Sequence, residues 1–130
     1  ESYLRGLSNA EAQHFLNLNP SYVFFKDSHR RAVTYMDIPA TDERTIASDE
    51  AFFPKGAIGF LKFEKPTQPA RPNEPRPPTI PASRFVIDQD VGGVIKGGGR
   101  IDLFIGRGQD IRPWAFKGYG TLYYLAPKKK

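Results

Sequence analysis

The sequence contains no cysteine among its 130 residues, which excludes disulfides and metal sites built on thiolates. Its histidines are His14 and His29, too few for a histidine-rich zinc site, so we predict neither a metal nor a cofactor. No apolar run approaches the roughly 20 residues that a membrane-spanning helix needs. The sequence starts at Glu1 without an initiator Met, a signal peptide or a lipidation motif. We therefore expect a processed protein, an internal fragment or a trimmed chain.

Positive charge is in mild excess. The net charge is +5, and the basic tail Lys128–Lys130 supplies three of these charges. Such a balance favours an anionic partner: a nucleic acid, an acidic polymer or a membrane surface. A nucleic-acid binder is expected to interleave basic and aromatic residues along one stripe, and this sequence has no such stripe. We therefore rank nucleic-acid binding last.

Residues 1–20 predict a leading helical segment. Ser8 and Glu11 have the spacing of a capping box, and apolar residues then recur on one helix face. Asn19-Pro20 ends the pattern, because a residue that precedes proline avoids the α region. We expect a helix over residues 8–18.

Residues 21–127 alternate short apolar runs with Gly and Pro, which predicts a mainly β domain. A βαβ sheet would need helices of roughly 10–15 residues between its strands, so we favour a barrel. The predicted strands are Ser21–Phe25, Arg44–Ser48, Ala57–Phe63, Phe85–Gln89, Arg100–Ile105 and Thr121–Ala126. We expect a hairpin tip at Lys26–Arg31, a turn at Phe52–Gly56 and a broken helical turn at Gln109–Phe116.

Residues 64–83 hold seven of the twelve prolines. Proline lacks a backbone N–H and fixes φ, so we predict that this run forms a long surface loop rather than helix or sheet. A docking segment for an aromatic groove is the alternative interpretation.

Aspartates stand inside two apolar runs, Phe85–Gln89 and Arg100–Ile105, which we expect to be central strands. Period two places Val86, Asp88 and Asp90 on one side of the first. An aspartate in an apolar strand is costly unless it is hydrogen-bonded, paired or functional. If the strands bring Asp90 and Asp102 together, one carboxyl would stay protonated near neutral pH, as cleavage of a glycosidic bond requires.

Each of these residues also has a purely structural interpretation. Asp88 fits an edge or turn residue, and Asp90 fits a turn residue that bonds its own backbone. Gly97-Gly98-Gly99 is typical of a turn, since no Walker or Rossmann pattern surrounds it. Lys96 fits either a solvated lysine or a group that steadies an anion. Spacing alone does not choose among the aspartates.

Four segments resemble a known family, the MltA-type membrane-bound lytic transglycosylases. Their sequences are LNLNPSYVFF (Leu16–Phe25), RTIASDEAFFPKGAIGFL (Arg44–Leu61), DQDVGGVIKGGGRIDLFIGRG (Asp88–Gly108) and GTLYYLAP (Gly120–Pro127). The family's catalytic module is the 3D domain, named for three aspartates. The resemblance implies a double-psi β-barrel, with a substrate groove between it and a second domain. It also implies a periplasmic or envelope location, with an outer-membrane anchor in an N-terminal region.

The resemblance implies cleavage of peptidoglycan between N-acetylmuramic acid and N-acetylglucosamine, with a 1,6-anhydro end formed without water. The acid/base falls on Asp102, and the supporting carboxylates on Asp90 and Asp49. It leaves Asp88 without a role in the chemistry. Gly92, Gly93, Lys96 and Tyr22 are the expected substrate-binding residues.

This chain departs from the family pattern in two places that bear on the site. Val91 stands where a threonine is usual, and Ser48 where an apolar residue is usual. We therefore keep a second hypothesis, a non-catalytic barrel that binds glycan through aromatics such as Tyr22, Phe24 or Trp114.

Overall fold

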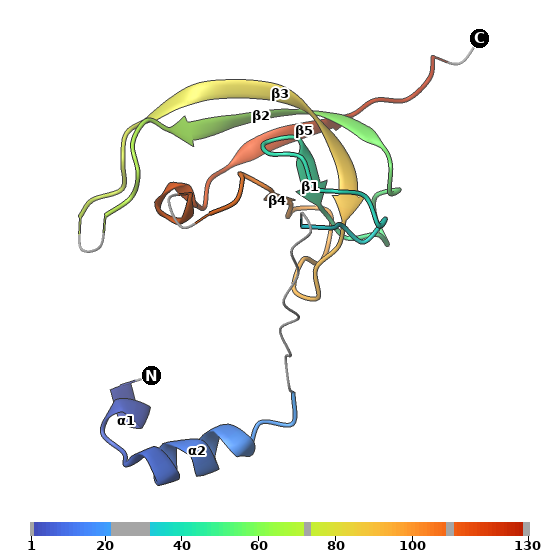
Figure 1. Ribbon diagram of the computed structural model, residues 1–130. Helices are drawn as coiled ribbons and strands as arrows, with labels where there is room; N and C mark the ends of the chain where they lie inside the picture. The colour runs from blue at the N-terminus through green and yellow to red at the C-terminus, as the bar shows by residue number, and fades with distance from the viewer. Residues whose placement is uncertain (1, 22–31, 72–73, 109–110, 129–130) are drawn as a thin grey trace.

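The computed structural model describes the chain except residues 1, 22–31, 72–73, 109–110 and 129–130 (Figure 1). Two helices lead a five-stranded sheet. The elements are α1 (Ser2–Arg5), α2 (Asn9–Asn17), β1 (Thr45–Ala47), β2 (Ile58–Pro66), β3 (Thr79–Asp90), β4 (Asp102–Leu103), the 3₁₀ helix η1 (Arg112–Trp114) and β5 (Gly120–Tyr124). The predicted strand Ser21–Phe25 and hairpin tip Lys26–Arg31 lie outside the described residues, apart from Ser21 itself.

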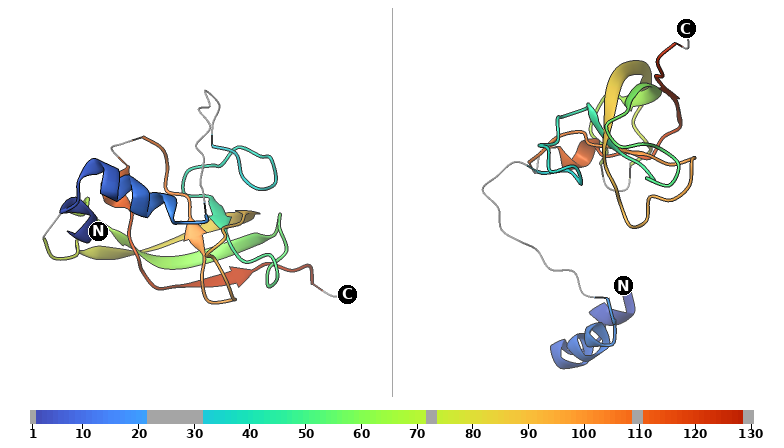
Figure 2. Two further views of the ribbon diagram at one scale, coloured as in Figure 1. Left: turned by 90° about the horizontal axis from the view of Figure 1, so that it is seen from below. Right: turned by 90° about the vertical axis from the view of Figure 1, so that its right-hand side faces the viewer.

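Helix α2 begins as the capping box predicts. The Ser8 hydroxyl accepts the backbone N–H of Glu11, and the Glu11 carboxylate accepts the Ser8 N–H at 3.0 Å. Tyr3 of α1 packs edge-on against Phe15, with ring centroids 5.5 Å apart. The helices lie apart from the sheet in Figure 1 and in the right-hand view of Figure 2, and α2 has no buried residue. The leading helix is thus confirmed, and it contributes nothing to the core of the sheet.

The sheet is mixed, with the strand order β4-β1-β3-β2-β5. β1 runs parallel to β3, and the other pairs are antiparallel. The mainly β prediction is confirmed. Among the described residues no strand pairing joins β4 to β5, so these strands form an open, strongly curved sheet (Figure 1).

The prediction that residues 64–83 form only a loop is wrong at both ends. β2 continues to Pro66 and β3 begins at Thr79, and these two residues face each other in the ladder. Here β3 has no second neighbour, because β1 pairs with it only from Ile87 onward. Pro81 therefore lies on a free edge, where its missing N–H costs no ladder bond. The remaining loop is confined to residues 67–78.

The second aspartate-bearing segment is not a central strand, as we had expected for Arg100–Ile105. Only Asp102 and Leu103 pair, and β4 is an edge of the sheet. Phe85–Gln89 is central as predicted, within the longer β3. The core is formed by Ile46, Leu61 and Val86, against which Phe63, Ile101, Leu103 and Leu122 pack. The aspartate-bearing ends of β1, β3 and β4 are therefore anchored on one small apolar core.

Candidate functional site

Strand register gathers aspartates from three segments around the end of β1. Ala47 is paired with Asp90 of β3 on one side and with Asp102 of β4 on the other. Asp49 follows two residues after Ala47. Since neighbouring strands lie about 4.8 Å apart, the backbones of Asp90 and Asp102 are about 10 Å from each other. The three aspartates thus lie at the same end of the neighbouring strands β4, β1 and β3.

Asp49 is almost fully buried and its carboxylate is held by backbone amides. One oxygen accepts the Gly97 N–H at 2.8 Å, and the other accepts the Ala51 N–H at 3.1 Å. These two hydrogen bonds, Gly97 first, lower the pKa of Asp49, and the charges of Lys96 and Lys55 act in the same direction. Asp49 is therefore a fixed anion that ties the segment after β1 to the glycine-rich turn, residues 92–99.

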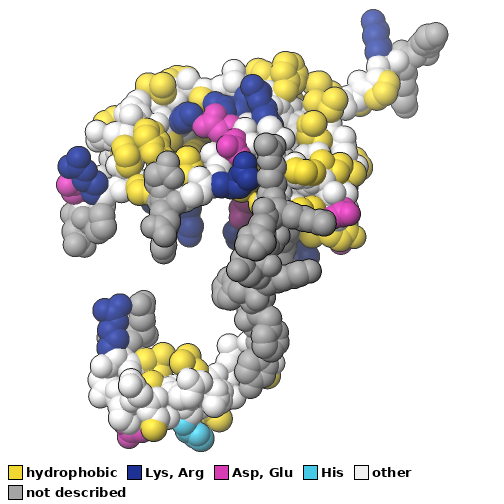
Figure 3. Space-filling view, viewed as in Figure 1, with side chains coloured by type: hydrophobic (Ala, Val, Ile, Leu, Met, Phe, Trp, Pro, Cys, Tyr) yellow, Lys and Arg dark blue, Asp and Glu magenta, His cyan; other side chains and the backbone are white. Residues whose placement is uncertain are grey.

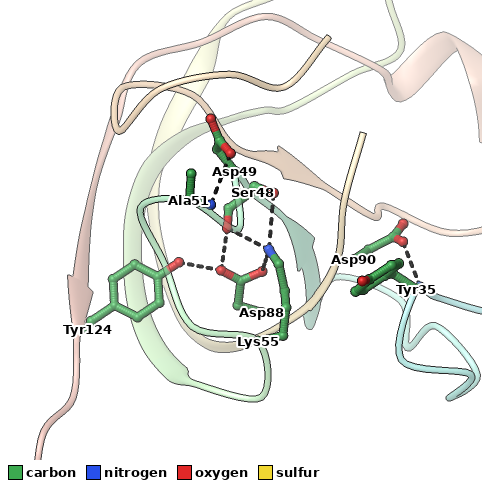
Figure 4. A network of polar contacts seen from close by, with 8 residues as sticks. All are labelled: Tyr35, Ser48, Asp49, Ala51, Lys55, Asp88, Asp90 and Tyr124. Carbon is green, nitrogen blue, oxygen red and sulfur yellow. Dashed lines mark hydrogen bonds and ion pairs between the residues drawn. The ribbon is translucent and has the colours of Figure 1, made fainter. Parts of the chain in front are cut away.

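Asp90 ends β3 at an irregularity in the ladder. The register with β1 shifts between Ile46 and Ala47, so Gln89 is an extra residue there. The alternation that would place Asp88 and Asp90 on one side is interrupted, and the Asp90 carboxylate points away from Asp88 (Figure 4). One Asp90 oxygen accepts the Tyr35 N–H at 2.9 Å.

Asp102 lies on the exposed edge of the sheet, not in apolar surroundings as the sequence suggested. Its side chain is 53% exposed and faces Arg100, which is 49% exposed. Two long contacts, 3.3 and 3.4 Å, join the Arg100 guanidinium to the carboxylate. A substrate can therefore reach this carboxylate directly, and the cation beside it is easily redirected.

The positions of the glycine-rich turn differ in the space around them and in backbone conformation. A Cβ on Gly92 would meet the Ile95 side chain at 2.7 Å, so Gly92 lets the buried Ile95 pack. Gly93 faces open space, and Lys96 is exposed beside Asp49. Gly97 has φ +81°, and its amide holds Asp49. The predicted substrate-binding residue Tyr22 lies outside the described residues.

The interpretation of Asp88 as an edge or turn residue is wrong. Asp88 is 0% exposed, and three side chains converge on its carboxylate (Figure 4). Lys55 Nζ lies 2.7 Å from Oδ1, while the Ser48 and Tyr124 hydroxyls donate to Oδ2 at 2.5 and 2.6 Å. These four residues, Ser48, Lys55, Asp88 and Tyr124, are called the Asp88 network below. Sequence reasoning missed Lys55 and Tyr124. One signal could have indicated that Asp88 is buried and needs partners: it follows Val86 by two residues, so both side chains face the same side of β3.

The Asp88 network leaves no hydrogen of the Lys55 ammonium idle. Lys55 also donates to the Ser48 carbonyl at 3.0 Å and to the Ser48 hydroxyl at 2.8 Å. Burial, and then the hydrogen bond to Asp88, raise the pKa of Tyr124 well above its ordinary value. Tyr124 also stacks on Phe53 with ring centroids 4.7 Å apart. The network thus joins β3, β5 and the segment after β1.

Two hollows of the described surface are lined by residues other than Asp49, Asp90 and Asp102. One has a volume of about 190 Å³ and is lined by Phe63, Leu103, Trp114 and Phe116 among others. Basic and acidic side chains lie next to one another on the face in Figure 3, with apolar patches beside them. This face therefore offers no single-signed charged surface.

Within the described residues, no three His, Asp or Glu side chains are grouped to hold a metal ion. In that same part of the chain, no helix has the length and apolarity to cross a membrane.

A family model described as the 3D domain matches residues 44–126. The chain belongs to the 3D domain family. The match runs from the residue before β1 to beyond β5, so it includes the three aspartates and the Asp88 network. The predicted resemblance to the MltA-type 3D domain is confirmed.

Solved structures of lytic transglycosylases resemble the 3D domain and its leading segment. MltA from Escherichia coli is 26% identical with a TM-score of 0.65, over 96% of this chain and 36% of that chain. E. coli MltA with bound chitohexaose gives 29% identity and a TM-score of 0.67, over 94% and 36%. LtgG of Burkholderia pseudomallei is 34% identical with a TM-score of 0.63, over 88% of this chain and 33% of that chain. No curated protein matches the chain.

The chain spans about a third of the length of these solved proteins. Their similarity reaches beyond the 3D domain, because it covers 94–96% of this chain for the two E. coli structures.

Proposed function

We propose that this chain is the catalytic 3D domain of a lytic transglycosylase. It cleaves the β-1,4 bond between N-acetylmuramic acid and N-acetylglucosamine in peptidoglycan and leaves a 1,6-anhydro end. The observation that carries the proposal is the register at Ala47, which brings Asp90 and Asp102 to either side of the end of β1. Membership of the 3D domain family and the likeness to MltA and LtgG support it.

Asp102 is the single acid and base of the proposed reaction. Its protonated carboxyl gives the proton to the glycosidic oxygen as the bond to the muramoyl C1 breaks. The resulting carboxylate then takes the proton of the C6 hydroxyl, and O6 bonds to C1. No water is consumed, which separates this scheme from that of ordinary glycosidases with two carboxylates. The exposure of Asp102 supports this role, since a glycan strand must reach it.

Asp90 and Asp49 support the reaction in different ways. Asp49, an anion fixed by two backbone amides, stabilises the turn before Asp102 and adds negative potential near the oxocarbenium-like centre. Asp90 presents its second oxygen for a sugar hydroxyl while the first accepts the Tyr35 amide. Gly93 and Lys96, both exposed, let a glycan approach the turn, with Gly92 shaping it and Tyr22 as a further contact.

The proposed substrate groove needs a second wall. We propose that a further domain of the same enzyme, or an N-terminal segment, provides it and completes a double-psi barrel with the open sheet. We also propose a periplasmic or envelope location with an outer-membrane anchor. The net charge of +5 suits an acidic wall polymer.

A non-catalytic glycan-binding domain is the second candidate. The hollow of about 190 Å³ beside Trp114 and Phe116 favours it, because an aromatic wall of this kind can stack on a sugar ring. Tyr22 and Phe24, the other aromatics of this hypothesis, lie outside the described residues.

Digestion of purified peptidoglycan with mass analysis of the products separates the two candidates. From the whole enzyme, whose second wall completes the groove, we expect anhydro-muropeptides, formed about 10² to 10⁴-fold more slowly in Asp102→Asn. Co-sedimentation with sacculi without any product, unchanged in Asp102→Asn and weakened in Trp114→Ala, would instead establish the binding domain.

A further inference from the structure

We propose that the Asp88 network positions the three aspartates, so that Lys55, Asp88 and Tyr124 are positioning residues for the reaction. This inference rests on the proposed function for its kinetic part alone. Its structural part concerns the direction of the Asp49 carboxylate and the anchoring of the glycine-rich turn.

The first link runs from the network to Ser48. Each polar group of Ser48 is engaged: its hydroxyl donates to Asp88 and accepts from Lys55, and its carbonyl accepts from Lys55. Its N–H donates to the Asp90 carbonyl at 3.2 Å. Ser48 is 0% exposed. One residue is thereby fastened to the network and to the backbone of Asp90 together.

The second link runs from Ser48 to the site. Asp49 is the next residue, so the fixed peptide of Ser48 sets where its carboxylate points. That carboxylate accepts the Gly97 N–H at 2.8 Å, and Gly97 belongs to the glycine-rich turn that leads to Asp102. Loss of the network would therefore loosen Asp49, the turn and the approach to Asp102 in that order.

Stability alone is a weak reason for this arrangement. Asp88 is 0% and Lys55 11% exposed by side chain, so both charges have lost most of their hydration. Replacing such a pair with apolar groups of similar size is often neutral or stabilising. The network instead makes its contacts with Ser48, the residue before Asp49. A displacement of a catalytic group by about 1 Å can lower the reaction rate about a hundredfold.

The test uses the double variant Asp88→Ala/Lys55→Met, which removes both charges and so leaves neither buried alone. By NMR titration, we expect the pKa of Asp49 to rise toward the ordinary Asp value, because its amide partners move. We expect hydrogen exchange at the Gly97 amide to become at least about tenfold faster. On peptidoglycan, kcat should fall by about 10 to 100-fold with KM within about threefold. Asp88→Asn/Lys55→Met, which keeps an acceptor for Tyr124 and leaves no buried ammonium, should recover most of the loss.

The matched control is Phe60→Ala in β2, which lies outside the apolar core and packs against Phe85 with ring centroids 5.1 Å apart. It lowers stability but should leave the pKa of Asp49, the Gly97 exchange relative to its neighbours and kcat of the folded fraction unchanged. A folded double variant that keeps all three values would overturn the inference. If the wild type makes no product, the proposed function fails, and the Asp49 and Gly97 measurements still decide the positioning role.

Discussion

Asp88 and Asp102 belong to β3 and β4, the two strands that flank β1, and their carboxylates differ in burial. Asp88 is 0% exposed and receives three side-chain donors, whereas Asp102 is 53% exposed and touches one cation at 3.3 Å or more. A buried carboxylate whose two oxygens both accept side-chain hydrogen bonds has no path to a substrate. The comparison teaches that burial marks the carboxylate that organises the fold, and exposure the one available for chemistry.

Neutralising the exposed carboxylate of Asp102 tests this difference most strongly. We expect Asp102→Asn to lower the rate of peptidoglycan cleavage by about 10² to 10⁴-fold, the usual contribution of a general acid and base. Its stability should stay within about 0.5 kcal/mol of the wild type, because the side chain is on the surface. Product assays and urea unfolding measure the two effects. A variant with full activity would refute the role of Asp102.

Neutralising the buried carboxylate of Asp88 should lower the stability of the fold far more than Asp102→Asn does. Asp88→Ala leaves the Lys55 ammonium buried without its partner, so we expect a loss of about 3–5 kcal/mol in the free energy of unfolding. Adding Lys55→Met to this variant should recover most of that loss. Urea unfolding of the single and double variants checks the prediction, and equal stabilities would show that the pair is not energetically coupled.

The free energy of unfolding at alkaline pH tests the role of Tyr124 in the Asp88 network. The pKa of Tyr124 is raised in the fold, so its contribution is complete below its ordinary value of about 10 and is lost as the pH rises above that value. Tyr124→Phe should remove this part of the pH dependence between about pH 10 and 12. Thermal unfolding at several pH values measures it. Parallel curves for the two proteins would contradict the assigned burial and hydrogen bond.

The smallest expected effect belongs to the helical segment. Ser8→Ala removes the cap of α2, which should cost about 1 kcal/mol of helix stability. Because α2 has no buried residue, the sheet should unfold as before. Hydrogen exchange of the α2 amides, compared with those of β3, follows the two regions separately. Loss of protection in β3 as well would show that the helix supports the sheet.

Local signals predicted local structure well. The capping box at Ser8 and the turn that ends at Gly56 with φ +84° each depend on neighbours in the sequence. Their free energies are set within a few residues, so composition and spacing suffice.

Long-range pairing decided the rest. The partners of Asp88, Lys55 and Tyr124, are 33 and 36 residues away, and no sequence period links them. Pro66 joins a strand because Thr79 pairs with it across the loop, which the proline count obscured. The three aspartates were found through resemblance to a family, and their arrangement around Ala47 appears only in the register of β1.

Cleavage of peptidoglycan in water enriched in ¹⁸O, with mass analysis of the new ends, tests the central claim most directly. If Asp102 acts as a single acid and base, the wild-type enzyme yields 1,6-anhydro ends without ¹⁸O, and Asp102→Asn forms them at least about a hundredfold more slowly. Reducing ends that carry ¹⁸O, or anhydro ends formed at the wild-type rate in Asp102→Asn, would contradict the account.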